Sequence, residues 1–192
     1  MQSRLDVEHG NACLPADSTY TRGMTQAIRD ATANDLAAIQ VLNEAVTPAV
    51  NSLDLAELRW FLDNASYFRL VEREDGELLA FLIGLEEGRN YRSLNYKWFA
   101  QRHDRFAYVD RIAVANAGRR LGLASRLYDD FIDKVAHKSG LLVCEVNTKP
   151  RNDGSLAYHE ALGFKPVGTQ WTENNTKEVV LLERPLKDRS NE

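Results

Sequence analysis

The spacing of apolar residues in the first third of the chain predicts a short strand followed by two helices. Residues 27–31 (AIRDA) are expected to form the strand. Apolar residues then recur every three or four positions from Leu36, which is typical of an amphipathic helix. Thr32 precedes this helix with capping-box-like spacing, and Pro48 limits its far end. A second helix is expected over 53–64 (LDLAELRWFLDN).

The middle of the chain predicts a β-hairpin and then a stretch without periodicity. Residues 66–87 hold two β-prone runs on either side of Glu74-Asp75-Gly76, and the Asp-Gly pair strongly favours a tight turn. Residues 88–105 have no regular spacing and are rich in aromatic and basic residues, so we expect them to be irregular.

The last part of the chain predicts alternating strands and helices. The expected elements are a strand over 106–114, a helix over 121–139, a strand over 141–147, a helix over 155–162, and strands over 164–171 and 177–186. The full order, β-α-α-β-β-β-α-β-α-β-β, predicts an α/β or α+β domain with a mixed sheet.

The chain is expected to form one domain behind a short tail. Residues 1–23 show no periodicity, and we expect a loose tail there, followed by a single domain over 24–192. Met24 is a candidate alternative translation start, because the patterned part begins directly after it.

Composition and charge exclude several classes of protein. The 192 residues are 44% hydrophobic, which is enough for one domain with a sizeable core, and the net charge of −4 gives no overall basic footprint for nucleic acid. No apolar run approaches the roughly 20 residues that span a membrane, and no signal peptide opens the chain. The two cysteines lie far apart and imply no disulfide framework, so we expect a cytoplasmic protein.

The turn before the helix at 121–139 is a candidate anion site. The first N–H groups of a helix have no intrahelical acceptor and lie at the positive end of its dipole, which suits phosphate groups. Gly122 would allow a ligand close to the backbone, and Arg119 and Arg120 add permanent positive charge. The turn has neither the Lys of a P-loop nor the three glycines of a Rossmann turn. Taken alone, it is equally compatible with a tight turn that carries two solvated arginines.

A second stretch, residues 147–164 (NTKPRNDGSLAYHEALGF), changes this balance. Together the two stretches resemble the GNAT superfamily of acetyl-CoA-dependent N-acetyltransferases. Residues 144–164, together with residues 43–54 (NEAVTPAVNSLD), also look like a bacterial subgroup of this superfamily. The signature R/Q-x-x-G-x-G/A is met by residues 119–124 (RRLGLA). The second motif is met at Asn152, Ser155, His159, Gly163 and Phe164, where His159 stands at the position of the family's tyrosine.

The resemblance implies a mostly antiparallel mixed sheet of six to seven strands with about four helices, and acetyl-CoA as co-substrate. It implies that the pyrophosphate lies on the turn formed by Arg119, Arg120, Leu121, Gly122, Leu123, Ala124 and Ser125. It implies that the pantetheine arm lies against Ile112, Ala113 and Val114, with Asn152, Ser155 and His159 close to it. It also implies a backbone N–H near Val114 as the oxyanion donor, and it leaves a homodimer open.

Three residues are candidates for proton transfer. An alkyl amine is mostly protonated at pH 7, so its acetylation needs a base, and a carboxylate serves this purpose. Asp110 is one candidate, expected on the same face of its strand as Ile112 and Val114, and Glu145 is the other. His159 could protonate the departing thiolate or could only pack against the cofactor. Tyr158, one residue earlier on a helix, is rotated by about 100° and is no simple substitute.

The stretch 88–105 could form a wall over the acceptor site through Tyr91, Tyr96 and Trp98, or could be a solvated loop with a satellite core. It carries five basic residues against one acid. This charge favours a small-molecule primary amine with an anionic or aromatic group and disfavours polycationic aminoglycosides.

The leading hypothesis is therefore an N-acetyltransferase that acts on a primary amine. A protein N-terminus remains an alternative acceptor. A non-catalytic acyl-CoA-binding module and an unrelated phosphate-binding domain remain alternative functions. No His, Cys or Asp spacing suggests a metal site, and no nucleic-acid or membrane partner is expected.

Overall fold

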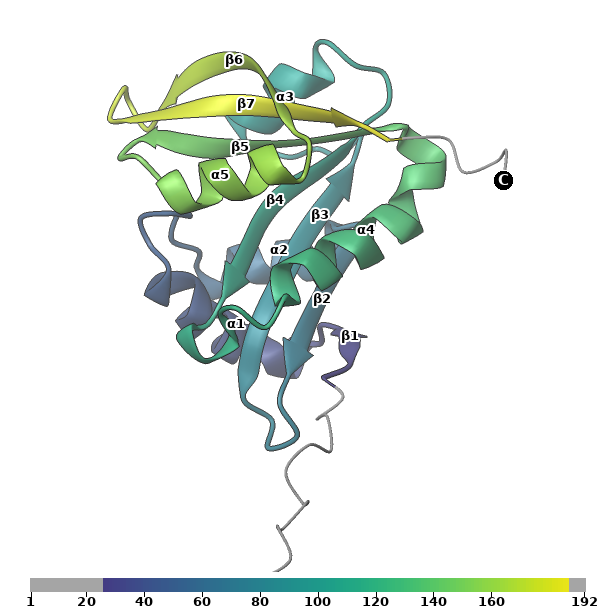
Figure 1. Cartoon of the computed structure of the whole chain (residues 1–192), viewed down its shortest axis with the longest axis vertical. Helices are drawn as coiled ribbons and strands as arrows, with labels where there is room; N and C mark the ends of the chain where they lie inside the picture. Colours follow the sequence, from purple (N-terminus) through teal and green to yellow (C-terminus); the bar gives the residue numbers. More distant parts are fainter. Residues whose placement is uncertain (1–25, 187–192) are drawn as a thin grey trace, which may run out of the picture.

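A computed structural model describes residues 26–186, apart from the side chains of residues 136 and 137. One seven-stranded sheet runs through it in the order β1-β2-β3-β4-β5-β7-β6 (Figure 1). The strands are β1 (Ile28–Asp30), β2 (Tyr67–Glu72), β3 (Leu78–Glu86), β4 (Ala107–Val114), β5 (Leu141–Lys149), β6 (Lys165–Thr172) and β7 (Lys177–Pro185). The mixed, mostly antiparallel sheet is thus confirmed, and the expected tail at 1–23 lies outside the described residues.

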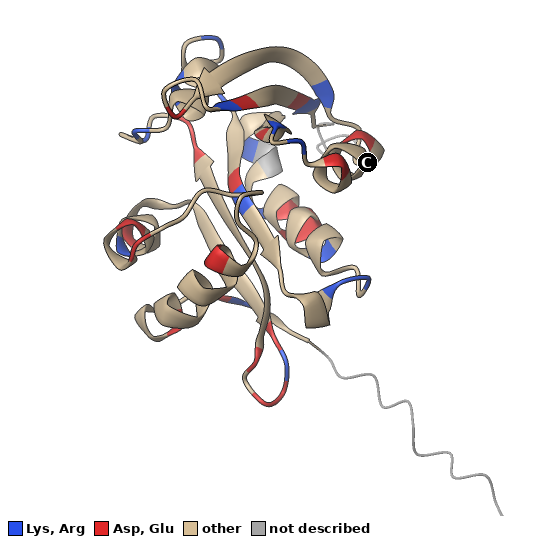
Figure 2. Ribbon diagram, turned by 90° about the vertical axis from the view of Figure 1, so that its left-hand side faces the viewer, with Lys and Arg blue, Asp and Glu red and all other residues tan. Residues whose placement is uncertain are grey.

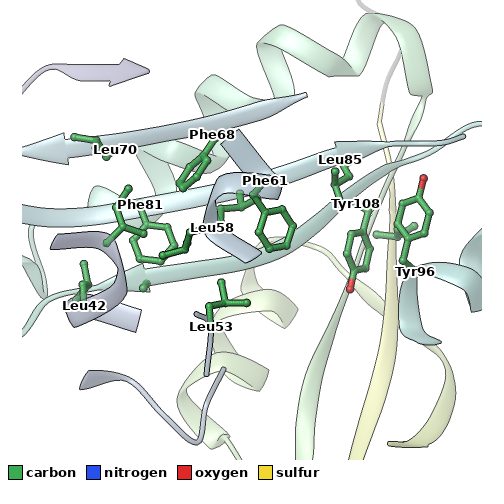
Figure 3. Packing of buried hydrophobic residues seen from close by; sticks show 14 of the residues in the cluster. Leu42, Leu53, Leu58, Phe61, Phe68, Leu70, Phe81, Leu85, Tyr96 and Tyr108 are labelled. Carbon is green, nitrogen blue, oxygen red and sulfur yellow. The ribbon is translucent and has the colours of Figure 1, made fainter. Parts of the chain in front are cut away.

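Within residues 26–186, five α-helices cover the two faces of the sheet. They are α1 (Leu36–Ala45), α2 (Leu55–Asn64), α3 (Leu94–Ala100), α4 (Leu123–Ser139) and α5 (Asp153–Ala161). Apolar residues of α1, α2 and α3 share one core with the sheet, and those of α4 and α5 share a second core on the opposite face. Figure 3 shows Leu58 and Phe61 of α2 beside Phe68 and Phe81 of the strands in the first core.

Local sequence signals set most of the boundaries. The capping box at Thr32 is present and leads through a 3₁₀ turn into α1, which ends before Pro48. Asp54 caps α2, since its side chain accepts a hydrogen bond from the N–H of Glu57 at 2.8 Å. Gly140 ends α4 at φ = 67°, a conformation that glycine adopts without steric cost. The strands and helices predicted from hydrophobic spacing are therefore confirmed to within a few residues.

The prediction of an irregular stretch over 88–105 was wrong, because α3 lies inside it. Ser93 caps this helix by accepting a hydrogen bond from the N–H of Tyr96 at 3.3 Å. Tyr96 and Phe99 are buried three positions apart on its inner side. The helix has only seven residues, too few for helical periodicity to stand out among the surrounding charged residues.

The two central strands β4 and β5 run parallel and then diverge. They pair only at Ala107 with Leu142 and at Tyr108 with Val143. On its other side β4 pairs antiparallel with β3 along its whole length, and β5 does the same with β7. The divergence therefore opens the sheet near its middle, where Figure 1 shows β4 and β5 separating.

A β-bulge in β4 corrects the expected orientation of Asp110. Gly84 of β3 pairs with Val109, while the preceding Ile83 pairs with Arg111, so Asp110 is an extra residue without a partner in the ladder. The extra residue reverses the alternation, and Asp110 contacts Tyr91 on the face opposite to that of Ile112. Such a bulge cannot be read from the apolar pattern of this strand.

Charged residues of both signs are interspersed over the helices and loops (Figure 2). Among residues 26–186, no helix combines the length and the apolar character needed to cross a membrane.

Candidate active site

A cavity of 1410 Å³ lies where β4 and β5 diverge. Its walls come from the loop between α1 and α2, the first turns of α2, residues 90–95, the second half of β4, the middle of β5, α5, and the turn between β6 and β7, together with Arg119 and Tyr128. All of these segments are carried by the sheet or packed on it. The predicted site residues from β4, β5 and α5 thus meet around one space.

The turn before α4 has the shape expected of an anion site. Arg120 and Gly122 both adopt positive φ, at 64° and 71°, so the chain curls sharply before the helix begins at Leu123. A Cβ atom added at Gly122 would meet no heavy atom within 4 Å, which leaves open space above the backbone. The N–H of Arg126 donates to the Gly122 carbonyl at 3.0 Å, whereas the N–H groups at the start of the helix lack intrahelical acceptors.

The other predicted cofactor residues divide into cavity-lining and supporting positions. Ile112, Ala113, Val114, Arg119, Asn152, Ser155 and His159 line the cavity. Arg120, Leu121, Gly122, Leu123, Ala124 and Ser125 do not line it. Leu123 is buried in the core beneath α4, whereas Leu121 is 51% exposed.

Asn152 has a structural task as well as a place on the cavity wall. Its side-chain oxygen accepts a hydrogen bond from the N–H of Ser155 at 3.1 Å and thereby caps α5. The cap fixes the start of the helix that carries His159.

His159 is buried and held by hydrogen bonds at both ring nitrogens. Its Nδ1 lies 2.7 Å from the carbonyl oxygen of Ser155, and its Nε2 lies 2.7 Å from the hydroxyl of Tyr128. A carbonyl can only accept, so Nδ1 carries the proton and Nε2 accepts from the phenol. Burial lowers the pKa of His159 below its usual value, which favours the neutral ring. The arrangement makes His159 a poor proton donor and a good partner for Tyr128.

Glu145 of β5 is the predicted base that keeps one carboxylate oxygen without a hydrogen-bond partner among the described residues. Its Oε1 accepts hydrogen bonds from Asn95 Nδ2 at 2.8 Å and from the Tyr108 hydroxyl at 2.9 Å. Its Oε2 is buried and has no hydrogen-bond partner among the described residues. Burial, together with the nearby Asp110 carboxylate, raises the pKa of Glu145 to about 8. A carboxyl group of this kind exchanges protons near neutral pH.

Asp110 is held in a buried ion pair. Its Oδ2 accepts from Arg111 Nε at 2.7 Å, and its Oδ1 accepts from the Tyr91 hydroxyl at 2.6 Å. The side chains of Asp110 and Arg111 are 4% and 6% exposed. Arg111 also donates from Nη1 to the Asn43 side chain and to the Asn51 carbonyl, so it ties the loop between α1 and α2 to β4. Both oxygens of Asp110 are thus occupied, whereas Oε2 of Glu145 has no hydrogen-bond partner among the described residues.

The predicted acceptor residues are separated by the fold. Tyr91 lines the cavity and stacks on Trp60, with ring centroids 5.2 Å apart and planes at 20°. Tyr96 does not line it, because the residue is buried and its hydroxyl donates to the Glu86 carbonyl. Trp98 lies elsewhere too, against Gly168 of β6.

The basic residues of 88–105 also lie mostly outside the cavity. Of the five, only Arg92 lines it, and Arg92 pairs with Glu57 of α2. Arg102 instead lies over the ring of Trp98, 3.6 Å from its centroid. The local positive charge counted along the sequence is therefore not the charge of the cavity.

Several functional candidates have no motif that marks them. Tyr128, Tyr108, Asn95, Arg111 and Trp60 contact or surround the predicted residues. Of these residues, only Tyr128 is marked by a sequence signal. It is a tyrosine among the aliphatic residues and phenylalanine of the buried face of α4.

Among the described residues, no group of three His, Cys, Asp or Glu side chains could hold a metal ion.

The comparisons with known proteins agree with this architecture. A family model described as the acetyltransferase (GNAT) family matches residues 32–164, well over half of the chain. The chain belongs to the GNAT family of acetyltransferases. No curated protein matches it.

Solved GNAT structures share the fold at low sequence identity. Ard1 from Thermoplasma volcanium is 17% identical with a TM-score of 0.67, and the match covers 84% of this chain and 97% of that one. The ribosomal-protein-S18-alanine N-acetyltransferase from Escherichia coli is 17% identical with a TM-score of 0.62, covering 86% and 97%. A phosphinothricin acetyltransferase from Sinorhizobium meliloti, in complex with AcCoA, is 20% identical with a TM-score of 0.62, covering 88% and 92%. At these identities the matches establish the fold, and their acceptors are properties of those proteins.

Proposed function

We propose that this GNAT protein transfers the acetyl group of acetyl-CoA to a primary amine, with Glu145 as the group that takes the amine proton. The observation that carries the proposal is that Glu145 lines the cavity and that its buried Oε2 has no hydrogen-bond partner among the described residues. A small-molecule amine is the acceptor class proposed. The stacked Trp60 and Tyr91 support an aromatic body for it.

The turn before α4 and the part of β4 that lines the cavity suit the phosphates and the extended arm of acetyl-CoA. The curled turn at Arg120 and Gly122, the free N–H groups at the start of α4 and the positive Arg119 suit a pyrophosphate. The second half of β4 lines the cavity and pairs with β3 only, so its other edge is available to an extended arm with amide groups. When bound, acetyl-CoA supplies an activated thioester.

The chain's own groups account for the proton. The ammonium of the acceptor first loses one proton to Glu145 Oε2, while Asn95 and Tyr108 hold the carboxylate through Oε1. As the neutral nitrogen then bonds to the acetyl carbon and the bond to sulfur breaks, a second proton leaves the nitrogen and passes to the departing thiolate, so that coenzyme A leaves as the thiol. A cationic amine beside Glu145 would lower the raised pKa of its carboxyl group and favour the ionised form that the reaction needs. Asp110 stays in its buried pair with Arg111 and acts as a fixed neighbour.

The test is thiol release from acetyl-CoA in the presence of a panel of primary amines, with the wild type and Glu145→Gln compared. We expect kcat/KM to fall by about 100-fold or more in Glu145→Gln, which is the range for loss of a general base, while acetyl-CoA binding persists. Glu86→Gln is the matched control, because Glu86 is a strand glutamate outside the cavity.

The outcomes separate the two functions considered. Tight coenzyme A binding without thiol release from any amine would support a binding module and reject the enzyme. Release that is unaffected by Glu145→Gln would reject Glu145 as the base and leave the acetyltransferase activity standing.

A further inference from the structure

The cations that line the acceptor side of the cavity are all engaged by acids of the same wall. Arg111 pairs with Asp110 at 2.7 Å, and Arg92 pairs with Glu57. The third cation, Lys177, lies 3.2 Å from Glu173. It also donates to the side chain of Asn51.

The remaining cation of the cavity belongs to the cofactor side. Arg119 lies in the turn before α4, where the N–H groups and the open backbone already form an anion site. Acids outnumber cations around the cavity as a whole, with Asp54, Glu57, Asp110, Glu145 and Glu173 against Arg92, Arg111, Arg119 and Lys177. Without Arg119, the acceptor side has three cations for five acids, of which Glu145 is mostly protonated at neutral pH because burial raises its pKa to about 8.

A carboxylate on the acceptor would therefore be poorly accommodated. It would lose water beside Asp110 and Glu145 and would find no unpaired cation among the described lining residues to replace it. Burying an unpaired charge is costly, and breaking the pair of Arg111 with Asp110 would leave another buried charge without a partner. The same surroundings favour a group with a positive charge.

Aromatic rings form the remaining part of this wall. Trp60 stacks on Tyr91, and Phe61 meets Tyr91 edge to face with centroids 5.4 Å apart. Trp60 and Tyr91 are both half-buried and line the cavity, so their rings are available to a ligand. Such surfaces bind flat apolar bodies and attract cations over their faces.

We infer that the acceptor is a cationic amine on an aromatic or apolar body that carries no carboxylate. This inference rests on the proposed function and names the substrate class for the same cavity. It differs from the expectation of an anionic acceptor drawn from the basic residues of 88–105, four of which do not line the cavity.

Matched pairs of amines test the inference, because each pair differs by one carboxylate. Thiol release is measured with tryptamine against tryptophan, tyramine against tyrosine, and phenethylamine against phenylalanine. We expect kcat/KM to be at least about 10-fold higher for the amine without the carboxylate in each pair, since one uncompensated charge in a desolvated site costs more than the 1.4 kcal/mol that a factor of ten represents. Equal or greater activity with the amino acids would overturn the inference and leave the proposed function intact.

A variant that frees one cation sharpens the test. Glu57→Gln removes the acid beside Arg92 while Gln still serves the capping box with Asp54. We expect the preference against the amino acids to narrow in Glu57→Gln. It should be unchanged in Glu178→Gln, whose parent residue pairs with Lys149 outside the cavity. If the wild type, Glu57→Gln and Glu178→Gln all prefer the amine over the amino acid to the same extent, charge pairing on this wall does not determine that preference. Absence of thiol release with every amine would reject the proposed function itself.

Discussion

The hydroxyl of Tyr128 on α4 donates a hydrogen bond to Nε2 of His159 on α5 over 2.7 Å. Both side chains are almost fully buried, at 1% and 4% exposure. Burial raises the pKa of Tyr128 well above its usual value and lowers the pKa of His159, so both groups stay neutral. The bond joins the two helices that cover the same face of the sheet, at the wall of the cavity.

This pair predicts a structural effect of His159→Phe. The substitution leaves the buried Tyr128 hydroxyl without an acceptor, which should lower the free energy of unfolding by about 1 to 3 kcal/mol. Tyr128→Phe should also destabilise, and the double variant should cost less than the sum of the two, as denaturant titration would show. We expect the KM for acetyl-CoA to rise in His159→Phe with kcat little changed. A large loss of kcat at unchanged KM would instead support His159 as the acid.

Glu145 predicts a specific pH dependence. Because the pKa of this carboxyl is raised to about 8, the basic form increases as the pH rises through 8, and kcat/KM of the wild type should rise with it. In Glu145→Gln this part of the rise should be lost, leaving the titration of the amine itself. A profile of the same shape in both proteins, measured from pH 6 to 10, would contradict the assignment.

The same group predicts a change in stability with the opposite sign. The pKa lies near 4.5 in an ordinary environment and near 8 in the folded protein, so the folded state binds the extra proton between these values. Stability contributed by the protonated group is therefore lost as the pH rises toward 8. Glu145→Gln should be more stable than the wild type at pH 9, by at most about 5 kcal/mol, and the difference should shrink toward pH 5. Thermal unfolding at the two pH values measures it.

Asn95 is predicted to position Glu145 and to lower the pKa of its carboxyl. It donates to Oε1, and its own side-chain oxygen accepts from Gln170 of β6 at 2.7 Å. Asn95→Leu removes a donor that favours the charged form, so the rise of kcat/KM should move to higher pH. Gln170→Leu should move it in the same direction by less. A uniform loss of activity at every pH, with the profile unmoved, would mean that Asn95 only supports the packing.

The turn before α4 predicts the loss of cofactor binding in Gly122→Glu. The new side chain adds a negative charge where the phosphates are expected, and we anticipate at least a 100-fold weaker affinity for coenzyme A by calorimetry. Gly76→Glu is the matched control, since Gly76 also has positive φ and open space around its Cβ position but lies in the hairpin turn. The two variants should lose similar stability. Undiminished affinity in folded Gly122→Glu would remove the turn from the site.

The elements that the sequence predicts well are those whose signals are local. Hydrophobic spacing and caps place the long helices and the strands, because burial of one face and the orphan N–H groups act within a few residues. The turn at Gly122 and the helix at Asn152 were found for the same reason. α3 was missed because seven residues carry too little periodicity.

The features missed at the site depend on contacts between distant segments. The bulge at Asp110 is a property of the pairing with β3, and the bond from Tyr128 to His159 spans 31 positions. The charge of the cavity likewise depends on which cations meet an acid, as Arg92 meets Glu57 across 35 positions. Counting charges along residues 88–105 could not show that most of them lie elsewhere.

The short pairing between β4 and β5 has a consequence for solvent exchange. Beyond Tyr108 and Val143, the described residues of β4 and β5 are not joined by backbone hydrogen bonds. The sheet therefore has two unpaired strand edges in its interior, in addition to the two at its ends. Unpaired strand edges usually form hydrogen bonds with another extended chain, but these two edges face into the cavity. In the free protein, N–H groups that point into this gap should exchange with deuterated water faster than their neighbours that point toward β3 and β7. An extended ligand between the strands should slow the deuterium exchange of these N–H groups. Binding would then lower exchange rates in the middle of the sheet and not at its outer edges.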